Sequence, residues 1–217
     1  MVEKSAVLTK LQKNKLVAVV RGNSNEQAYK TAKACIEGGV ASIELAFTVP
    51  RADEVINRLN KEYLDDDNVL IGAGTVLDPS TARIAMIAGA QYIVSPSFSE
   101  EVAKICNLYA VSYIPGCMTP IDIQSALTYG SEVIKLFPGS VVGSNMISEL
   151  HGPFPQARIM VTGGVTLDNL QEWFDKGTSV VGVGGSMVSP SERGDYHQVK
   201  KNASEFKNSL QKIHSIF

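Results

Sequence analysis

Short runs of β-branched and other apolar residues recur along the chain, and helix-like stretches with mixed polar residues separate them. The runs begin every twenty-odd residues, the length of one strand with its following helix. We expect strands at residues 16–21, 42–47, 69–76, 91–96, 111–116, 132–138, 158–164 and 179–185. Eight such units predict an α/β fold, a single-domain (β/α)8 TIM barrel over residues 1–217 with an extra N-terminal helix.

An open doubly wound sheet is the structural alternative, but it usually carries a glycine fingerprint in its first strand-to-helix turn. The turn here reads RGNSNE and lacks that fingerprint. Ser24, Ser99, Thr119 and Asp168 stand where helices should begin, and Gln27 follows Ser24 at capping-box spacing. Residues 1–15 and about 197–216 read as amphipathic helices that flank the repeat.

Composition, charge and cysteine content limit the kind of ligand and the compartment that we expect. Hydrophobic residues make up 44% of the 217, charged residues 19%, and the formal net charge is -2, which provides no field to attract nucleic acid. The three cysteines, Cys35, Cys106 and Cys117, are odd in number and form no C-x-x-C pair. No segment resembles a signal peptide or a membrane span. We therefore expect a cytoplasmic protein, away from membranes, with a small-molecule ligand.

In a (β/α)8 barrel the functional residues gather where the strands end, at their C-terminal side. Few polar residues occupy those positions here, and each is a candidate for the site: Arg21, Glu44, Thr75, Ser95, Lys135, Thr162 and Ser186.

Lys135 is conspicuous because all its neighbours in Val133-Ile134-Lys135-Leu136-Phe137 are apolar. Strand alternation directs it either into the barrel or into the helix layer, and only the barrel mouth accepts an ammonium group. Apolar surroundings favour the neutral amine, which can attack a carbonyl and form an imine. The alternatives are a lysine that reaches the rim or one that only pairs with a buried carboxylate.

Glu44 lies in an equally apolar strand, Ser42-Ile43-Glu44-Leu45-Ala46, where a carboxylate needs a partner. If Glu44 and Lys135 both face the barrel mouth, the carboxylate can move protons during imine formation and carbon–carbon bond cleavage. The competing interpretation is a counter-ion for Lys135 or Arg21.

Two glycine-rich strand ends, Thr162-Gly163-Gly164 and Gly184-Gly185-Ser186, bring backbone N–H groups close to any anion. They follow the seventh and eighth strands, where barrels of this type often bind phosphate. Glycine pairs also form tight turns without any ligand.

Metal binding and cysteine catalysis have weaker support. His151, His197 and His214 all fall outside the expected strand ends, so no metal site is expected. Cys117 follows the fifth strand but has no histidine at a strand end to activate it, which favours a packing role.

The segments GGVASIELAFTVP, IGAGTVLDP, GAQYIVSP, YIPGCMTP, VIKLFPG, GPFPQARIMVTGGV and VGVGGSMV occur in this order. Together they resemble the 2-keto-3-deoxy-6-phosphogluconate (KDPG) aldolase family, which includes 4-hydroxy-2-oxoglutarate (KHG) and 6-phosphogalactonate aldolases. The resemblance implies cofactor-free, class I cleavage of KDPG to pyruvate and glyceraldehyde 3-phosphate by a homotrimer. Within the family, the galactonate epimer or hydroxyoxoglutarate is the alternative substrate; outside it, the alternative is a non-catalytic barrel that binds sugar phosphates.

The resemblance also implies roles for residues. Lys135 would form the Schiff base and Glu44 would be the general acid and base. Thr75 and Pro96 match positions at the pyruvyl pocket, Phe137 matches an aromatic beside the imine, and Gly163, Gly164 and Ser186 match positions that contact the phosphate. Thr162 and Gly185, from the same two strand ends, are further candidate substrate-binding residues.

One position departs from the family pattern. Many members have an arginine four residues after the glutamate, where it helps to bind the substrate carboxylate, and this chain has Thr48 there. Arg21 and Arg51 are candidate substitutes. We favour Arg21, because the end of a strand is held more firmly than a loop.

Overall fold

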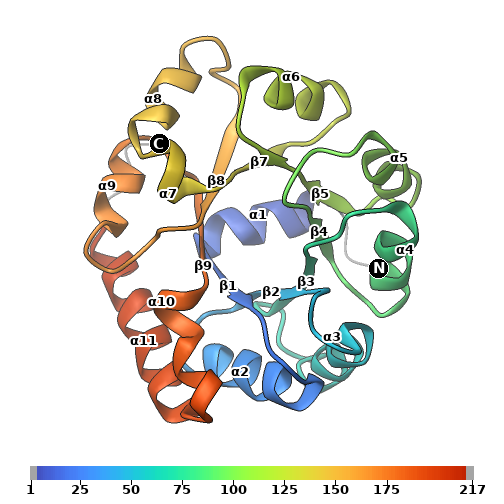
Figure 1. The fold of residues 1–217 in the computed structure, drawn as a ribbon, viewed down its shortest axis with the longest axis vertical. Helices are drawn as coiled ribbons and strands as arrows, with labels where there is room; N and C mark the ends of the chain where they lie inside the picture. The colour runs from blue at the N-terminus through green and yellow to red at the C-terminus, as the bar shows by residue number, and fades with distance from the viewer. Residues whose placement is uncertain (1–3, 214–217) are drawn as a thin grey trace.

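The computed structural model describes residues 4–213, which fold into a ring of parallel strands surrounded by helices (Figure 1). Every expected strand is present within a few residues of its expected bounds. The strands are β1 Leu16–Val20, β2 Ser42–Ala46, β3 Leu70–Gly74, β4 Tyr92–Val94, β5 Ser112–Ile114, β6 Gly116–Cys117, β7 Val133–Leu136, β8 Arg158–Thr162 and β9 Val180–Val183. The predicted α/β barrel is therefore confirmed.

The barrel closes through its fifth strand, which Pro115 divides into β5 and β6. The segment before Pro115 pairs with β4, and the segment after it pairs with β7. Proline lacks the N–H that a continuous ladder needs. Its carbonyl still accepts a 2.8 Å hydrogen bond from the backbone N–H of Lys135, which joins the two halves of the ring.

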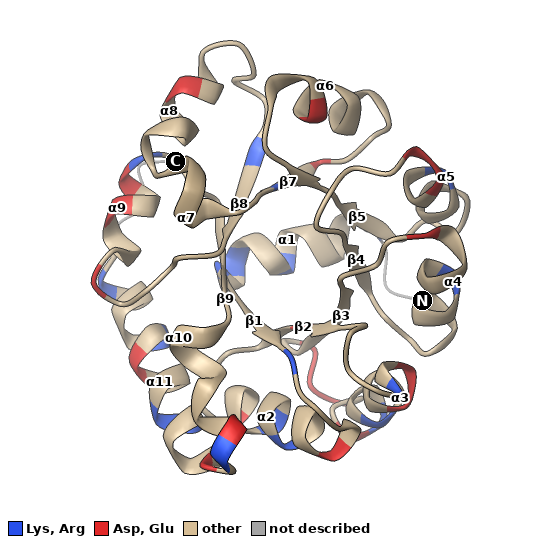
Figure 2. Cartoon of the chain, viewed as in Figure 1, with Lys and Arg blue, Asp and Glu red and all other residues tan. Residues whose placement is uncertain are grey.

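Helices cover the outside of the ring, and their outward faces carry most of the charged residues (Figure 2). They are α1 Lys4–Asn14, α2 Asn25–Glu37, α3 Ala52–Glu62, α4 Pro79–Ile87, α5 Glu100–Leu108, α6 Pro120–Thr128, α7 Gly139–Val142, α8 Asn145–His151, α9 Leu170–Asp175, α10 Gly185–Val188 and α11 Tyr196–Lys212, with a 3-10 helix at Ser189–Arg193. None of the helices between residues 4 and 213 is long and apolar enough to cross a membrane.

Most helix starts follow the sequence prediction. Ser24, Ser99 and Thr119 each accept a hydrogen bond from a first-turn backbone N–H, and Thr119 forms a full capping box with Asp122. The prediction for Asp168 is wrong: α9 begins one residue later, after Asn169. The Asn169 side chain stabilises the preceding turn, because its Oδ1 accepts a 2.8 Å hydrogen bond from the backbone N–H of Thr166.

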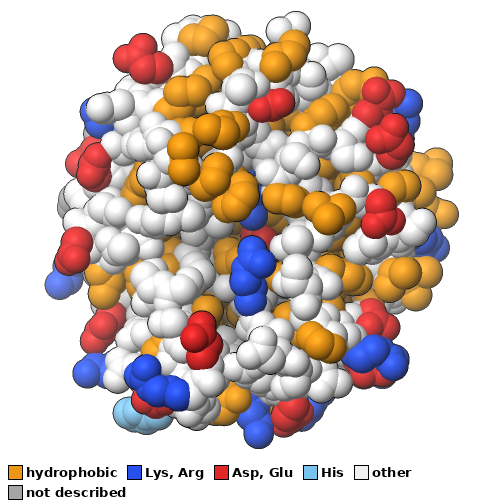
Figure 3. Space-filling view, viewed as in Figure 1, with side chains coloured by type: hydrophobic (Ala, Val, Ile, Leu, Met, Phe, Trp, Pro, Cys, Tyr) orange, Lys and Arg blue, Asp and Glu red, His pale blue; other side chains and the backbone are white. Residues whose placement is uncertain are grey.

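Helix α1 closes the N-terminal end of the barrel. Its apolar residues Val7, Leu8 and Leu11 join inward-facing strand residues, among them Tyr92 and Met160, in one buried cluster. In Figure 1, α1 lies behind the ring, so the viewer faces the C-terminal ends of the strands. Figure 3 shows that same face, where basic and acidic atoms lie together at the centre.

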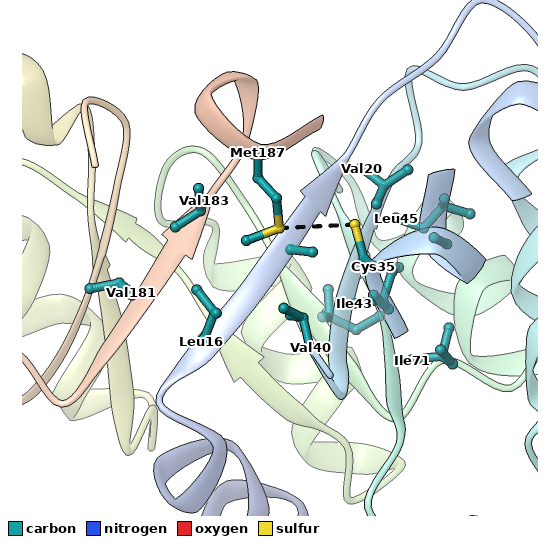
Figure 4. Packing of buried hydrophobic residues seen from close by; sticks show 14 of the residues in the cluster. Leu16, Val20, Cys35, Val40, Ile43, Leu45, Ile71, Val181, Val183 and Met187 are labelled. Atoms are coloured by element: carbon teal, nitrogen blue, oxygen red, sulfur yellow. Dashed lines mark hydrogen bonds between the residues drawn. The ribbon is translucent and has the colours of Figure 1, made fainter. Parts of the chain in front are cut away.

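A second, larger core lies between the strands and the outer helices. Figure 4 shows part of it, where Cys35 of α2 and Met187 of α10 approach to a sulfur–sulfur distance of 3.9 Å among Val20, Ile43 and Val183. Burial raises the pKa of the Cys35 thiol to about 12, so this cysteine packs as a small apolar residue.

Glycine in β3 creates space inside the barrel. A Cβ added at Gly72 would overlap the ring of Tyr92, which is fully buried and donates a 2.7 Å hydrogen bond to the Ile43 carbonyl. We expect Gly72→Ala to lower the free energy of unfolding by about 1–3 kcal/mol, because the ring has no room to move. Denaturant unfolding checks this. Gly152→Ala is the control for glycine replacement itself, because Gly152 has a φ of -60° and its added Cβ would meet nothing closer than 3.4 Å.

The ranges predicted for the two terminal helices include residues that the structure does not describe. Within the described residues, α1 forms the first helix from residue 4, and α11 forms the second as far as residue 212. The remainder of both predictions, and His214, lie outside residues 4–213. A single domain over residues 1–217 stays a prediction.

Candidate active site

Lys135 and Glu44 face each other across the interior of the barrel. Glu44 is the middle residue of β2 and lies in register with Val19 of β1 and Gly72 of β3. Lys135 of β7 lies in register with Gly116 of β6 and Met160 of β8. Because β2 and β7 stand on opposite sides of the ring, the two side chains meet in its centre.

The Lys135 ammonium nitrogen lies 3.2 Å from Oε1 of Glu44, and the side chains are only 6% and 1% exposed. The second oxygen of Glu44 is buried and has no hydrogen-bond partner among residues 4–213. A buried ion pair that serves stability alone needs its remaining lone pairs satisfied. The unpartnered oxygen therefore favours a carboxylate that completes its bonding with a ligand.

Gly74 explains how Glu44 fits at this depth. A Cβ at Gly74 would overlap the Glu44 carboxylate and its Cγ. The carboxylate thus occupies the volume that a side chain on β3 would fill. Sequence reasoning missed Gly74, although the pattern was available: Gly72 and Gly74 alternate along a buried strand and so share its inward face.

Tyr92 lies beneath the pair and was also missed, because it reads as ordinary core. Burial, and secondly the negative charge of Glu44, raise the pKa of Tyr92 well above its usual value. The phenol therefore stays neutral, and its hydrogen bond to the Ile43 carbonyl holds the backbone beside Glu44. Tyr92 is therefore a buried, uncharged side chain packed below the reactive groups.

The residues expected at the pyruvyl pocket and beside the imine follow the C-terminal ends of three strands, β3, β4 and β7. Phe137 places its ring centroid 5.2 Å from the Lys135 nitrogen. Thr75 has a φ of 55°, a left-handed conformation that is unusual for a β-branched residue and typical of functional sites. Pro96 is half-buried, and its carbonyl lies where a side chain on Gly116 would be.

Thr162 faces the interior at the end of β8. It is 6% exposed, and its hydroxyl has no hydrogen-bond partner within the described part of the chain. The neighbouring Gly182 leaves the space that this hydroxyl occupies. Ser95, another predicted hydroxyl residue, differs from Thr162 because it is buried and its hydroxyl donates a 2.6 Å hydrogen bond to the Val76 carbonyl.

The turn after β8 needs its glycines. Gly163 and Gly164 have φ angles of 94° and 80°, which L side chains rarely adopt. A Cβ on Gly164 would also lie 2.8 Å from the Cβ of Ser140 in α7. Gly163 is half-buried and Gly164 is exposed, and both lie beside the start of the short helix α7.

The turn after β9 leads directly into α10. Gly185 and Ser186 are exposed, and nothing lies within 4 Å of a Cβ added at Gly185. The Ser186 hydroxyl donates a 2.7 Å hydrogen bond to the Val165 carbonyl, which ties this turn to the one after β8. The first N–H groups of α10 have no partner within the helix and remain available to an anion.

The two candidate arginines differ in their surroundings. Arg51 is held by the acidic residues of its own helix start, Asp53 at 3.8 Å and Glu54 at closer range. Arg21 follows β1 directly, is exposed, and forms no ion pair with any residue from 4 to 213. Thr48 is exposed after β2.

Cysteine and metal chemistry gain no support. Cys117 is 2% exposed, and burial raises its pKa to about 12, so its thiol is not activated. His151 ends α8 and His197 lies in α11, both away from the strand ends. No group of three His, Cys, Asp or Glu side chains within residues 4–213 is arranged to hold a metal ion.

Comparison with known proteins agrees with this geometry. The family model for KDPG and KHG aldolase matches residues 7–202. The 2-dehydro-3-deoxy-phosphogluconate aldolase of Treponema pallidum is 37% identical over 193 residues, covering 87% of this chain and 90% of that protein. The 2-dehydro-3-deoxy-6-phosphogalactonate aldolase of Escherichia coli is 32% identical over 173 residues, covering 79% and 83%.

A solved structure is similar to the whole barrel. It is KDPG aldolase from Legionella pneumophila with pyruvate captured at low pH as a covalent carbinolamine intermediate. It is 25% identical to this chain with a TM-score of 0.82, and the match covers 90% of this chain and 95% of that one.

Proposed function

This chain belongs to the KDPG and KHG aldolase family, and we propose that Lys135 and Glu44 carry out its reaction, the reversible cleavage of KDPG to pyruvate and glyceraldehyde 3-phosphate. The observation that carries the assignment is the buried contact of 3.2 Å between the lysine nitrogen and the carboxylate, at the C-terminal end of the barrel.

The contact allows a proton to pass from the lysine to Glu44, which leaves a neutral amine to attack the keto carbon of the substrate. Glu44 returns that proton to the carbinolamine hydroxyl, which leaves as water and gives an iminium. Glu44 then accepts the proton of the C4 hydroxyl, the C3–C4 bond breaks, and its electrons enter the iminium to form an enamine. Protonation of C3 and hydrolysis release pyruvate and restore Lys135.

The substrate phosphate is proposed to bind the turns after β8 and β9. Backbone N–H groups of Gly163, Gly164, Gly185 and Ser186 supply the donors there. The Ser186 hydroxyl already donates to Val165, so its backbone N–H is the better candidate donor. Thr162, whose hydroxyl has no partner in the described chain, ends β8 directly before the first of these turns.

Arg21 is proposed to bind the substrate carboxylate in place of the arginine that Thr48 replaces. We expect Arg21→Ala to raise KM about tenfold or more with a smaller change in kcat, since a hydrogen bond to a charged group contributes about 1.5–3 kcal/mol. Arg51→Ala is the matched control, because its guanidinium is already paired within its own helix. Unchanged KM in Arg21→Ala, or an equal rise in both variants, contradicts the assignment.

The choice of substrate is tested by comparing the two epimers. In a coupled assay for pyruvate release, we expect kcat/KM to be highest for the gluconate compound and lower for the galactonate compound. We expect 4-hydroxy-2-oxoglutarate to give the lowest value of the three. The relative from E. coli makes the galactonate the second candidate. If no compound releases pyruvate, the chain is instead a sugar-phosphate-binding barrel without catalysis.

The working form is proposed to be a homotrimer, as the family resemblance implies, and its proposed compartment is the cytoplasm. The three cysteines are free and buried, which suits a reducing compartment. Light scattering is expected to give three times the 23.3 kDa of one chain. A mass of one or two chains contradicts the trimer without affecting the proposed reaction.

A further inference from the structure

The turn after β8, residues 163–169, begins with the two glycines whose N–H groups are proposed to bind the substrate phosphate. Glycine has more backbone freedom than any other residue, so the local sequence does not fix the directions of these N–H groups. Neither N–H donates a backbone hydrogen bond within residues 4–213. Contacts from outside the glycine pair must therefore hold the turn in one conformation.

Asn169, at the start of α9, makes three hydrogen bonds in and beside this turn. Its Oδ1 accepts from the backbone N–H of Thr166 at 2.8 Å and from the indole N–H of Trp173 at 3.1 Å. Its Nδ2 donates a 2.8 Å hydrogen bond to the carbonyl of Gly164. Asn169 thus joins the second glycine of the pair to α9.

The partners of Asn169 also fix which way its amide points. A backbone N–H and an indole N–H can only donate, so the atom that accepts from both must be the amide oxygen. The amide nitrogen then faces the Gly164 carbonyl. Trp173 is only 4% exposed, and the packing around its ring holds the indole N–H in place. The hydrogen-bond donor to Gly164 is therefore oriented by a buried side chain.

Two other contacts hold the carbonyls on either side of Gly164. The Gly163 carbonyl lies where a side chain on Gly139, the first residue of α7, would be. The Val165 carbonyl accepts the 2.7 Å hydrogen bond from the Ser186 hydroxyl of α10. Three consecutive carbonyls are thus held by three different elements, and Asn169 holds the middle one.

We propose that Asn169 is a positioning residue for the substrate phosphate. By holding the Gly164 carbonyl, it keeps the N–H groups of Gly163 and Gly164 directed at the phosphate oxygens before the substrate arrives. The inference rests on the proposed function, which places the phosphate at this turn, but it concerns a side chain with no proposed contact to the substrate. Loss of Asn169 should weaken phosphate binding and leave imine formation with a phosphate-free ligand unchanged.

The first test is Asn169→Ala in the full chain, which removes all three hydrogen bonds. Calorimetric titration with glycerol 3-phosphate measures phosphate binding apart from catalysis, because this probe has no carbonyl to react with Lys135. We expect its Kd to rise about tenfold, since a hydrogen bond and the order that it imposes on the turn are lost. Borohydride labelling of Lys135 with pyruvate, which carries no phosphate, should match the wild type.

The matched control is Asn60→Ala. Asn60 is also half-buried, and its amide donates a 3.2 Å hydrogen bond to the carbonyl of another glycine with a positive φ, Gly89. That turn precedes β4, so it lies at the opposite end of the barrel. This variant should bind glycerol 3-phosphate as the wild type does. Wild-type affinity in Asn169→Ala, or an equal loss in both variants, would overturn the proposal.

Asn169→Asp tests the amide N–H alone. A carboxylate still accepts from Thr166 and Trp173 and suits a helix start, but it cannot donate to the Gly164 carbonyl. We expect wild-type labelling with pyruvate and weaker binding of glycerol 3-phosphate. Salt screens the repulsion between the added charge and the phosphate. A loss relative to the wild type that vanishes at high salt would come from this charge alone and would overturn the proposal.

The two readouts also separate the positioning role from a role in folding and from the proposed reaction. Equal loss of phosphate binding and pyruvate labelling in both Asn169 variants would show that Asn169 only stabilises the fold, and would overturn the proposal. So would a wild-type chain that does not bind glycerol 3-phosphate. A wild-type chain that binds this probe but takes no borohydride label would instead contradict the proposed reaction.

Discussion

Replacing Lys135 with methionine is expected to abolish pyruvate release, with kcat lowered by roughly 10⁴-fold or more, as when other enzymes lose a covalent nucleophile. Methionine preserves the length and apolar packing of the side chain but cannot form an imine. Borohydride treatment in the presence of pyruvate is expected to add a stable label to the wild-type chain at Lys135 and none to the variant. Peptide mass mapping measures both results.

The matched control is Lys104→Met. Lys104 also forms an ion pair with a glutamate, Glu100, but on the exposed surface of α5. The Lys104→Met variant should retain pyruvate release and borohydride labelling at Lys135. A label on any lysine other than Lys135, or no label at all, would contradict the mechanism.

Loss of Lys135 should also destabilise the fold, and the two effects must be separated. Removing one member of a buried pair leaves a buried charge, which costs about 3–5 kcal/mol. The double variant Lys135→Met with Glu44→Gln removes that charge. It should regain most of the stability while remaining inactive, so a recovery of activity would show that the single variant had merely unfolded.

The strand order was predictable because strand and helix periods alternate cleanly along this chain. Apolar runs such as 16–21 and 42–47 are buried on both faces of a parallel strand, and the observed strands lie within them. The division of the fifth strand at Pro115 was not predicted, since proline is compatible with either a strand end or an interruption. The short helices α7 and α10 are also too brief to give a periodic signal.

The chemistry of the site was easier to predict than its geometry. Charged residues in apolar strands identified Lys135 and Glu44, and the structure brings them together. The unpartnered oxygen of Glu44 and the engaged hydroxyl of Ser186 depend on contacts between distant strands and turns, which no local pattern encodes. Which arginine could bind the substrate carboxylate, now that Thr48 replaces the family's arginine, likewise depends on where Arg21 and Arg51 lie in space.

Replacing Glu44 with glutamine is expected to lower kcat for cleavage by about 10²–10⁴-fold, the range typical of general acid–base groups. The amide has nearly the same shape, so it can still accept a hydrogen bond from Lys135 across the barrel. It cannot take up the proton of the C4 hydroxyl. Steady-state pyruvate release measures the change, with Glu100→Gln on the surface of α5 as the control.

The same variant separates proton transfer from a counter-ion role. A counter-ion acts only on the amine, so its loss would slow cleavage and imine formation with pyruvate by the same factor. A proton acceptor at the C4 hydroxyl acts after the imine has formed, and pyruvate has no such hydroxyl. We therefore expect Glu44→Gln to slow cleavage more than borohydride labelling at saturating pyruvate. Equal loss in both measurements would mean that Glu44 only keeps Lys135 reactive.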